Sequence, residues 1–349
     1  MSLTFAATVR ARLARSTRLT VALILLGTLA LFGVFAEIVA SPAPIVAIGH
    51  TRILMFPGVT HAVAYAEMDQ AAVRRLHQDD VALWPLVRYG PLTPAEVGPH
   101  APASLDHPLG TDAQGRDLAA RLIYGARTAL GLSLGAVLLG ILFGGAVGGL
   151  AGIYRGFWND RLVRLVETVD TFPAIIVVAL VRAIERQPSA LSLVIAVAAV
   201  RWAEVARLVR AEVLHADSED YVTAARALGA RPIRIFWRHI LPSAVGPVLV
   251  SSVFGVASVV LLEAAISFLA MGAPTRVASW GETLAEGARD PHHLRLILLP
   301  GFLLLATVGG SYLLADAVRD AIDPRASRLR AHCDHAPPCS PSNASPSPT

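Results

Sequence analysis

Six long apolar stretches alternate with more polar segments along the chain. They lie at about residues 19–40, 128–153, 162–181, 190–209, 243–270 and 296–315. An α-helix needs about 20 apolar residues to cross a hydrocarbon core that is about 30 Å thick. The pattern therefore predicts an all-α, polytopic membrane protein with six transmembrane helices and an extended external loop, residues 41–127, after the first helix.

The composition agrees with this class of protein. Hydrophobic residues make up 54% of the chain and charged residues only 16%, whereas a soluble domain has about 25% charged residues. The first apolar stretch, 19–40, is longer than the about 7–15 apolar residues of a signal peptide, and no convincing cleavage pattern of small residues closes it. We therefore expect it to stay in the protein as a membrane helix.

Basic residues indicate the orientation, and all 30 of them are arginine because the chain contains no lysine. Four arginines between residues 10 and 18 precede the first apolar stretch, which favours a cytoplasmic N-terminus, residues 1–18. Six crossings then place the loop 210–242 and the tail 326–349 in the cytoplasm as well. The net charge of +4 reflects this topology and contact with anionic lipids, so we expect no nucleic-acid partner.

The two cysteines, Cys333 and Cys339, lie in a tail that is rich in proline and serine. Its composition predicts disorder over 326–349, and a disulfide is not expected in the cytoplasm. The spacing in HCDHAPPC, residues 332–339, fits no standard zinc site. We therefore predict no metal site for this chain.

A half-charged segment, residues 219–242, separates the fourth and fifth apolar stretches. Asp217 or Ser218 suits the N-cap of a helix. Gly229 stands where a left-handed C-cap residue is expected, and Pro232 suits the first turn of a second helix. The segment therefore predicts two short helices that meet at a glycine.

The two predicted helices carry different surfaces. The apolar residues of the first helix are Tyr221, Ala224, Ala225 and Leu228; those of the second are Ile233, Phe236, Trp237 and Ile240, with Arg231, Arg234 and Arg238 on another side. The second pattern is typical of a helix that lies on lipid headgroups. The first has small residues, which allow close approach of another backbone and favour docking into a groove of a partner protein.

This segment resembles the cytoplasmic EAA loop of ABC-importer permeases, whose pattern is Glu-Ala-Ala, three residues, Gly and an Ile-x-Leu-Pro ending. The positions in register here are Thr223, Ala224, Ala225, Gly229, Leu241 and Pro242. Thr223 stands where the family has Glu, and His239 stands at the Ile position. The resemblance implies that this loop is a coupling helix held in a cleft of an ATPase subunit. The ATPase-coupling residues would be Tyr221, Thr223, Ala224, Ala225, Arg226, Leu228, Gly229, Leu241 and Pro242.

Four further blocks resemble the dipeptide/oligopeptide branch of these permeases. They are HPLGTDAQGRDLAARLIYGARTAL (107–130), LLEAAISFLAMG (261–272), SWGETLAEGARD (279–290) and LLADAVRDAIDPR (313–325). The blocks follow the family's order over residues 105–325. The resemblance implies a five-helix permease core at 128–325 in a bacterial inner membrane, and peptides as substrates.

The same resemblance implies the partners. They are a homologous second permease, two cytoplasmic ABC ATPase subunits and an extracytoplasmic substrate-binding protein. ATP and Mg²⁺ belong to the ATPase chains, because a chain without lysine has no Walker A loop. We therefore expect no catalytic residue and no cofactor bound by this chain. The insertion at 41–106 resembles the external loop of peptide permeases linked to microcin-type substrates; it is either a lid or a contact for the binding protein.

Charges within apolar stretches are costly and need a reason. Glu263 lies in the middle of the fifth stretch, where it is a candidate for a structural, path-lining or proton-coupling role. Arg201 and Glu204 are three residues apart and can neutralise each other on one helix. The glycines of GGAVGGLAG, 144–152, favour close helix packing, with a moving gate as the alternative.

His107, Asp112 and Asp117 lie in the block that begins HPLGTD. Gly110 and Gly115 are typical turn residues, so this block predicts a turn that leads into the second membrane helix rather than a metal or phosphate site.

Two other functions remain open at this point. A proton-coupled secondary transporter would use Glu263, Glu167 or Asp170, although the inverted repeats common in such proteins are not evident. A membrane scaffold that only recruits a partner through residues 219–242 would transport nothing.

Overall fold

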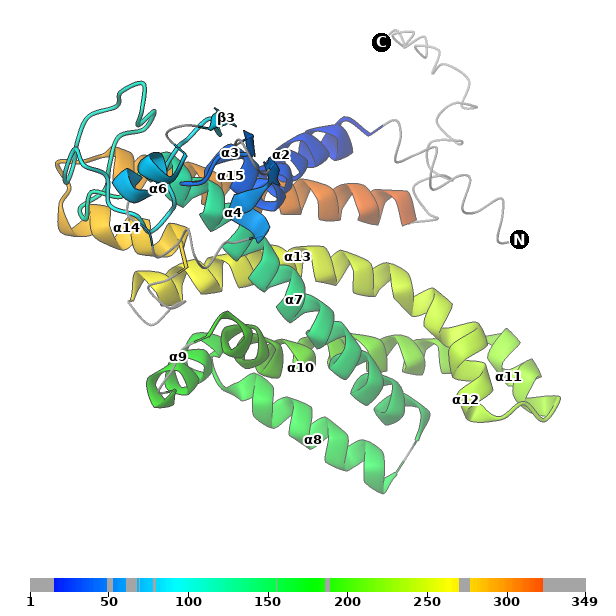
Figure 1. The fold of residues 1–349 in the computed structure, drawn as a ribbon. Helices are drawn as coiled ribbons and strands as arrows, with labels where there is room; N and C mark the ends of the chain where they lie inside the picture. Colours follow the sequence, from blue (N-terminus) through cyan, green and yellow to red (C-terminus); the bar gives the residue numbers. More distant parts are fainter. Residues whose placement is uncertain are drawn as a thin grey trace, which may run out of the picture.

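The computed structural model describes residues 16–322, apart from 49–52, 61–67, 69, 78–79, 155, 186–188 and 270–276. Within these residues the fold is mainly helical (Figure 1). Most of the predicted N-terminal segment, and the tail 326–349 with both cysteines, lie outside the described residues.

The elements of the N-terminal third are α2 (Thr17–Val34), α3 (Ala36–Val39), β1 (Val46–Ile48), β2 (Ile53–Met55), α4 (Pro57–Thr60), α6 (Gln70–Leu76) and β3 (Val81–Leu83). The elements of the remainder are α7 (Leu118–Ile153), α8 (Phe157–Thr171), α9 (Ala174–Ile184), α10 (Ala190–Asp217), α11 (Asp220–Ala227), α12 (Pro232–Ile235), the π-helix η1 (Phe236–Ile240), α13 (Leu241–Phe268), α14 (Trp280–Arg289) and α15 (Arg295–Ile322).

Four of the described helices are long and apolar enough to cross a membrane: α2, α7, α13 and α15. They coincide with four of the six predicted stretches. The fourth stretch lies on α10, which is long enough to span but carries charged residues and continues to Asp217, beyond the predicted end at 209.

The prediction of one continuous helix over 162–181 is wrong. Helix α8 ends at Thr171 and α9 begins at Ala174. Phe172 between them is extended, with ψ 129°, because the proline that follows disfavours helical backbone at the residue before it. The charged α8 and the apolar α9 together occupy the third predicted segment.

The helix ends separate into two groups (Figure 1). α7 and α10 end, and α8 begins, at the end of the bundle where α11 and α12 lie, whereas α9 and α14 lie at the opposite end. Arg18 at the start of α2 forms an ion pair with Asp320 near the end of α15, with 3.3 Å between Nη1 and Oδ2. The start of α2 and the end of α15 therefore lie side by side, on the same side of the molecule as α11 and α12 (Figure 1). Successive long segments therefore run in alternating directions.

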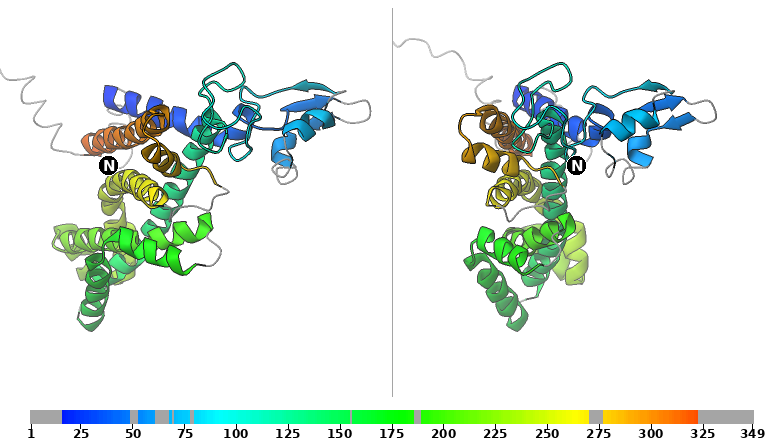
Figure 2. Two further views of the ribbon diagram at one scale, coloured as in Figure 1. Left: turned by 90° about the vertical axis from the view of Figure 1, so that its left-hand side faces the viewer. Right: turned by 60° about the vertical axis from the view of Figure 1, so that its left-hand side comes forward.

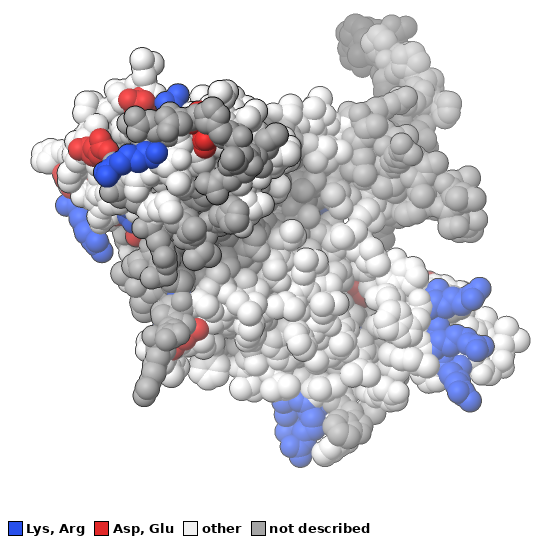
Figure 3. Space-filling view, in the orientation of Figure 1, with Lys and Arg blue, Asp and Glu red and all other residues white. Residues whose placement is uncertain are grey.

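Charge follows the same division. On the face seen in Figure 3, arginines gather at the end that carries α11 and α12, and acids and arginines gather around the opposite end. The described surface between them is largely uncharged, apart from a group of arginine atoms at the lower edge, over α8. A broad uncharged band between charged ends is the surface expected of a membrane-embedded bundle.

A small antiparallel sheet, in the order β2-β1-β3, forms within the predicted external loop. It stands to one side of the helices (Figure 2). Helix α6 lies in the same loop, between β2 and β3 in sequence. The sheet itself was not expected from the sequence.

Glycines let α7 approach α10 closely. A Cβ atom at Gly148 would lie 2.2 Å from the carbonyl oxygen of Ala206, and one at Gly144 would lie 2.4 Å from that of Trp202. Gly145, between them in sequence, has nothing within 4 Å of its Cβ position. The packing role predicted for these glycines is confirmed, because small residues permit this backbone contact.

A buried ionic network joins the turn before α7 to α14. Asp112 accepts from Arg116 Nε at 2.7 Å and from Arg121. Glu286 of α14 accepts from both arginines, at 2.6 Å from Arg116 and 2.7 Å from Arg121. All four side chains are at most 10% exposed.

The segment that begins HPLGTD, before α7, forms the predicted turn. Gly110 and Gly115 have φ of +76° and +77°, which is the left-handed region that favours glycine. Asp117 caps α7 by accepting from the backbone N–H of Ala120 at 2.8 Å, and its other oxygen lies 2.7 Å from His107 Nδ1.

Helix α14 is also fixed by Trp280, which is fully buried. The Trp280 indole N–H donates to the carbonyl oxygen of Leu122 at 2.9 Å. A Cβ at Gly125 would lie 2.5 Å from the Trp280 ring, so a glycine is needed there. These contacts and the ionic network fasten α14 to the first turns of α7.

We expect Asp112→Asn to destabilise the fold by about 1.5–3 kcal/mol, since it removes one of the carboxylates that balance the two buried guanidinium groups and leaves Glu286 as their remaining buried partner. Chemical unfolding in detergent, followed by tryptophan fluorescence, measures this loss. Arg18→Ala removes an exposed ion pair and should cost about 0–1 kcal/mol. Equal effects of the two variants would contradict a stabilising role for the network.

The same network predicts a pH dependence. Burial alone would raise the pKa of Asp112, but the Arg121 and Arg116 guanidinium groups together hold it below its ordinary value. Its stabilising contribution is therefore present above the unfolded-state pKa of about 3.9 and is lost as pH falls through the lower folded-state pKa. The difference in unfolding free energy between wild type and Asp112→Asn should shrink over that range.

Gly148→Ala should destabilise the protein by about 1–3 kcal/mol, because the added methyl group collides with a backbone oxygen that cannot rotate away. Gly145→Ala is the matched control in the same helix; it should be neutral or stabilise slightly. Both are measured as thermal unfolding in detergent. A harmless Gly148→Ala would show that the α7–α10 contact is looser than described.

Candidate functional site

The connection between α10 and α13 holds most of the predicted site residues. Its first helix, α11, begins after Glu219, and the N-cap prediction of Asp217 or Ser218 is wrong. Helix α10 continues through Asp217, and Ser218 caps its C-terminal end. Two residues, Ser218 and Glu219, separate α10 from α11.

Gly229 ends α11 in the predicted left-handed conformation, with φ +79°. The Gly229 N–H donates to the Arg226 carbonyl at 2.9 Å, and the Ala230 N–H donates to the Ala225 carbonyl at 3.1 Å. This pair of bonds is a Schellman motif. No atom lies within 4 Å of a Cβ built at Gly229, so the backbone conformation, and not crowding, requires glycine.

One side of α11 is fastened and the other is open. Val222 is fully buried in a cluster with Val213, Ile235 and other residues of α10 and η1. Leu228 is 89% exposed and Tyr221 44% exposed, and Thr223 and Ala224 are exposed as well. The open side thus combines two large apolar residues, Tyr221 and Leu228, with the smaller Thr223 and Ala224.

Arg226 is exposed and forms an ion pair with Asp217. This ion pair joins α11 to the last residue of α10, across the connection formed by Ser218 and Glu219. Together with Val222 it fixes the angle between the two helices.

The second predicted helix is part of a longer one, because α12, η1 and α13 follow each other without a break from Pro232 to Phe268. The predicted apolar face is wrong in part. Ile235, Phe236 and Ile240 are buried, whereas Ile233 and Trp237 are 45% and 64% exposed.

A π-turn changes the register further along this helix. The Leu241 N–H donates to the Phe236 carbonyl, five residues back, and Pro242 has no N–H to donate. The wider turn rotates the following residues relative to α-helical spacing. Leu241 and Pro242 lie in the first turn of α13, and Leu241 packs against the cluster that contains Val222 of α11.

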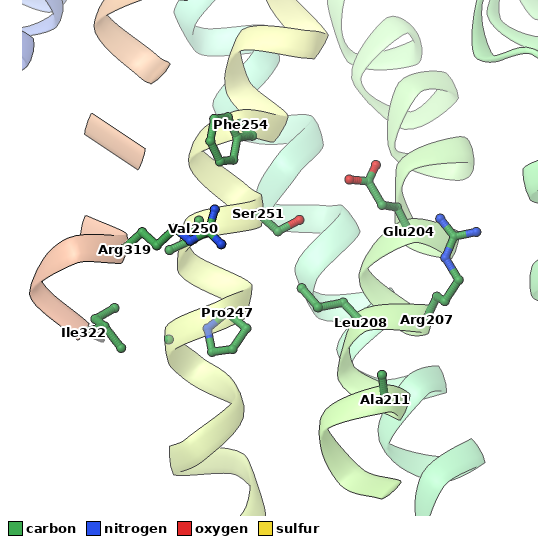
Figure 4. Close-up of a pocket in the computed structure, with 11 residues that line it drawn as sticks. Glu204, Arg207, Leu208, Ala211, Pro247, Val250, Ser251, Phe254, Arg319 and Ile322 are labelled. Carbon is green, nitrogen blue, oxygen red and sulfur yellow. The ribbon is translucent and has the colours of Figure 1, made fainter. Parts of the chain in front are cut away.

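A cavity of about 770 Å³ lies between α10, α13 and α15 (Figure 4). Its lining residues are Glu204, Arg207, Leu208, Ala211, Gly246, Pro247, Val250, Ser251, Phe254, Arg319 and Ile322. They come from the halves of the three helices nearest to α11 and α12. The walls are mainly apolar, with a few charged and hydroxyl groups.

The charged groups of the cavity have different partners. Glu204 pairs with Arg201 at 2.6 Å, as predicted, and Arg207 pairs with Asp170. Arg319 forms no ion pair with any residue in the described part of the chain. The arrangement offers both signs of charge beside an apolar wall. Arg207 and Arg319 were not singled out from the sequence; their only signal was arginine near an apolar stretch.

Glu263 is separate from this cavity. It is 1% exposed, and its Oε1 accepts hydrogen bonds of 2.8 Å from Ser267 and from Ser279 at the start of α14. In this structure it joins α13 to α14. A path-lining or proton-coupling role for Glu263 stays a prediction.

The part of the chain that contains α11 and the cavity is similar to known proteins. Residues 123–328 match the family described as "Binding-protein-dependent transport system inner membrane component". The oligopeptide transport system permease protein of Bacillus subtilis is 32% identical over 241 residues, which cover 68% of this chain and 78% of the relative.

Two further relatives are similarly close. The dipeptide transport system permease protein of Alkalihalophilus pseudofirmus is 35% identical over 64% of this chain and 73% of its own length. The glutathione transport system permease protein of Pectobacterium atrosepticum is 35% identical over 63% of this chain and 73% of its own length.

A solved structure shares the fold. An inward-facing conformation of the MetNI methionine ABC transporter aligns with a TM-score of 0.51 at 18% identity, over 58% of this chain and 95% of that chain.

Proposed function

Because the chain belongs to the family of binding-protein-dependent transport system inner membrane components, we propose that it is the membrane-spanning permease subunit of an ATP-driven importer of peptides. The names of the relatives support the substrate class, since dipeptides, oligopeptides and glutathione are all peptides. ATP hydrolysis, with its Mg²⁺, belongs to partner chains. The chain itself binds no cofactor in this proposal.

The open side of α11 is the docking surface for a cytoplasmic ATPase subunit. The single observation that carries this is the exposure of Leu228 and Tyr221 on a helix whose other side is buried through Val222. Large exposed apolar residues on a firmly attached helix are typical of a helix that docks into a groove. In the complete transporter, one ATPase subunit would bind this chain and a second would bind a homologous second permease.

This assignment fixes the orientation of the chain. With α11 in the cytoplasm, both termini are cytoplasmic, and the sheet and α14 lie outside, where a substrate-binding protein delivers peptide. The membrane is the inner membrane of a bacterium.

Helix α11 is attached to the helices that line the cavity, so a movement of α11 would displace the cavity walls. Helix α11 is joined to α10 by the Arg226–Asp217 pair and to η1 by the Val222 cluster. α10 and the continuous α12–η1–α13 helix form two of the cavity walls. ATPase closure that tilts α11 would therefore move α10 against α13 and change access to the cavity.

The cavity suits a peptide in transit. A free peptide carries an ammonium group and a carboxylate, and the lining offers Glu204 for the first and Arg319 for the second. The apolar remainder accepts side chains without selecting among them. We assign this cavity to the inner half of the transport path.

Gly229→Val tests the docking surface. A β-branched residue in the left-handed region costs about 1–3 kcal/mol of backbone strain, so the end of α11 should unfold or turn away. Co-purification with the ATPase subunits and ATP-driven peptide uptake in proteoliposomes should both be lost. Gly156→Val, at another glycine with positive φ and open space around it, introduces backbone strain away from α11; it is the control and should keep both.

Leu228→Asp separates docking from strain, because it adds a charge to the open side without changing the backbone. It should also weaken ATPase association. Normal association of both variants would refute the docking proposal. Uptake driven by a proton gradient without ATP would instead support a secondary transporter, and no uptake under either condition would support a scaffold.

Ser251→Trp tests the cavity. The large ring should fill the space between α10 and α13 and abolish most uptake, while ATPase association stays normal. Leu249→Trp, on an exposed position of the same helix, should leave uptake near the wild-type rate. Undiminished uptake by Ser251→Trp would exclude this cavity from the path.

A further inference from the structure

Two histidines and an aspartate meet at the end of the bundle opposite α11. His100 lies in the loop before α7, Asp290 caps the end of α14, and His293 lies in the turn to α15. His293 Nδ1 is 2.9 Å from Asp290 Oδ2, and His100 Nε2 is 3.7 Å from the same oxygen. One candidate donor atom from each residue lies within 4.8 Å of the other two.

These distances are close to those of a metal site. Bonds of about 2.1 Å to a tetrahedral ion separate neighbouring donor atoms by about 3.4 Å, and the two distances to Asp290 lie on either side of this value. Two imidazoles with a carboxylate form a donor set that suits Zn²⁺ and similar transition-metal ions. Three protein ligands leave a fourth position for water.

An ion can reach the cluster from solvent. The side chains of His100, His293 and Asp290 are 23%, 30% and 37% exposed. Coordination requires the two imidazole rings to separate, since they are now stacked with centroids 3.8 Å apart. His100 Nδ1 is buried without a hydrogen-bond partner in the described structure, so rotation of this ring breaks no hydrogen bond at that atom.

The ligands are held by the ionic network described above. The His100 N–H donates to the Asp112 carbonyl at 3.0 Å, and the Asp290 N–H donates to the Glu286 carbonyl at 3.3 Å. His100 has φ +56°, an uncommon conformation for a residue other than glycine that the surrounding structure must maintain. The backbones of two ligands are thus positioned before any ion binds.

We propose that His100, Asp290 and His293 form a binding site for a transition-metal ion of the Zn²⁺ class. The bound ion fastens the loop before α7 to the turn between α14 and α15. Arg295 lies nearby, but its Nη2 donates to the Ala101 and Thr111 carbonyls; its positive charge lowers the affinity for a cation without occupying the site. The inference is independent of the transport proposal.

The test uses the full-length chain, purified in detergent and freed of metal with a chelator. Co²⁺ serves as the probe, because its visible absorption reports coordination, and Zn²⁺ is then added as a competitor. The wild type should bind one more equivalent of Co²⁺ than His100→Ala or His293→Ala. Zn²⁺ should displace it.

His292→Ala is the matched control. His292 is exposed, is adjacent to the cluster in sequence and contributes no ligand, so this variant should retain the wild-type stoichiometry. The tail with His332 and Cys333 is present in every variant, and any metal it binds cancels in the comparison. Equal Co²⁺ binding by all four proteins would overturn the proposal.

A second measurement needs only the wild type and therefore does not depend on the folding of the variants. Histidine modification by diethylpyrocarbonate is located by mass spectrometry with and without Zn²⁺. Zn²⁺ should protect His100 and His293 but leave His292 reactive. Unchanged modification of His100 and His293 at saturating Zn²⁺ would also overturn the proposal.

Discussion

The buried pairing of Asp112 and Glu286 with two arginines is the constraint on which one end of this molecule depends. Arg121 and Glu286 are 165 residues apart in sequence, yet each charge would be strongly unfavourable in a buried site without the other. The network therefore requires α14 to lie against the start of α7. α14 in turn contacts α13 through Ser279 and Glu263, so three helices are fixed relative to one another at this end.

The opposite end is built differently. There α10, α13 and α15 diverge around a cavity of about 770 Å³, and the helices are joined through α11 and the π-turn rather than through buried charges. A bundle that is rigid at one end and divided at the other can pivot about its rigid end. Under the docking proposal, a small displacement of α11 would change the width of the cavity while the far end keeps its shape.

Local chemistry was readable from the sequence. A glycine at the end of a helical pattern indicates a left-handed cap whatever surrounds it, which is why the conformation of Gly229 could be predicted. The register after Pro232 could not, because a π-turn depends on how Phe236 and Ile240 pack against α10. The break at Phe172 had a local signal, the following proline, but the apolar periodicity on both sides obscured it. The role of Glu286 could not be predicted, since no local pattern relates it to Arg116 and Arg121, which lie 170 and 165 residues away in sequence.

The tip of α11 also has a chemical consequence. The chain contains no lysine, so amine-reactive reagents find no side-chain target anywhere along it. Leu228, which is 89% exposed, is a position where an introduced primary amine would be accessible and would be the one side-chain amine of the chain. A bifunctional reagent attached there would link this helix to whichever macromolecule covers it, and no competing modification elsewhere on the chain's side chains would confuse the identification.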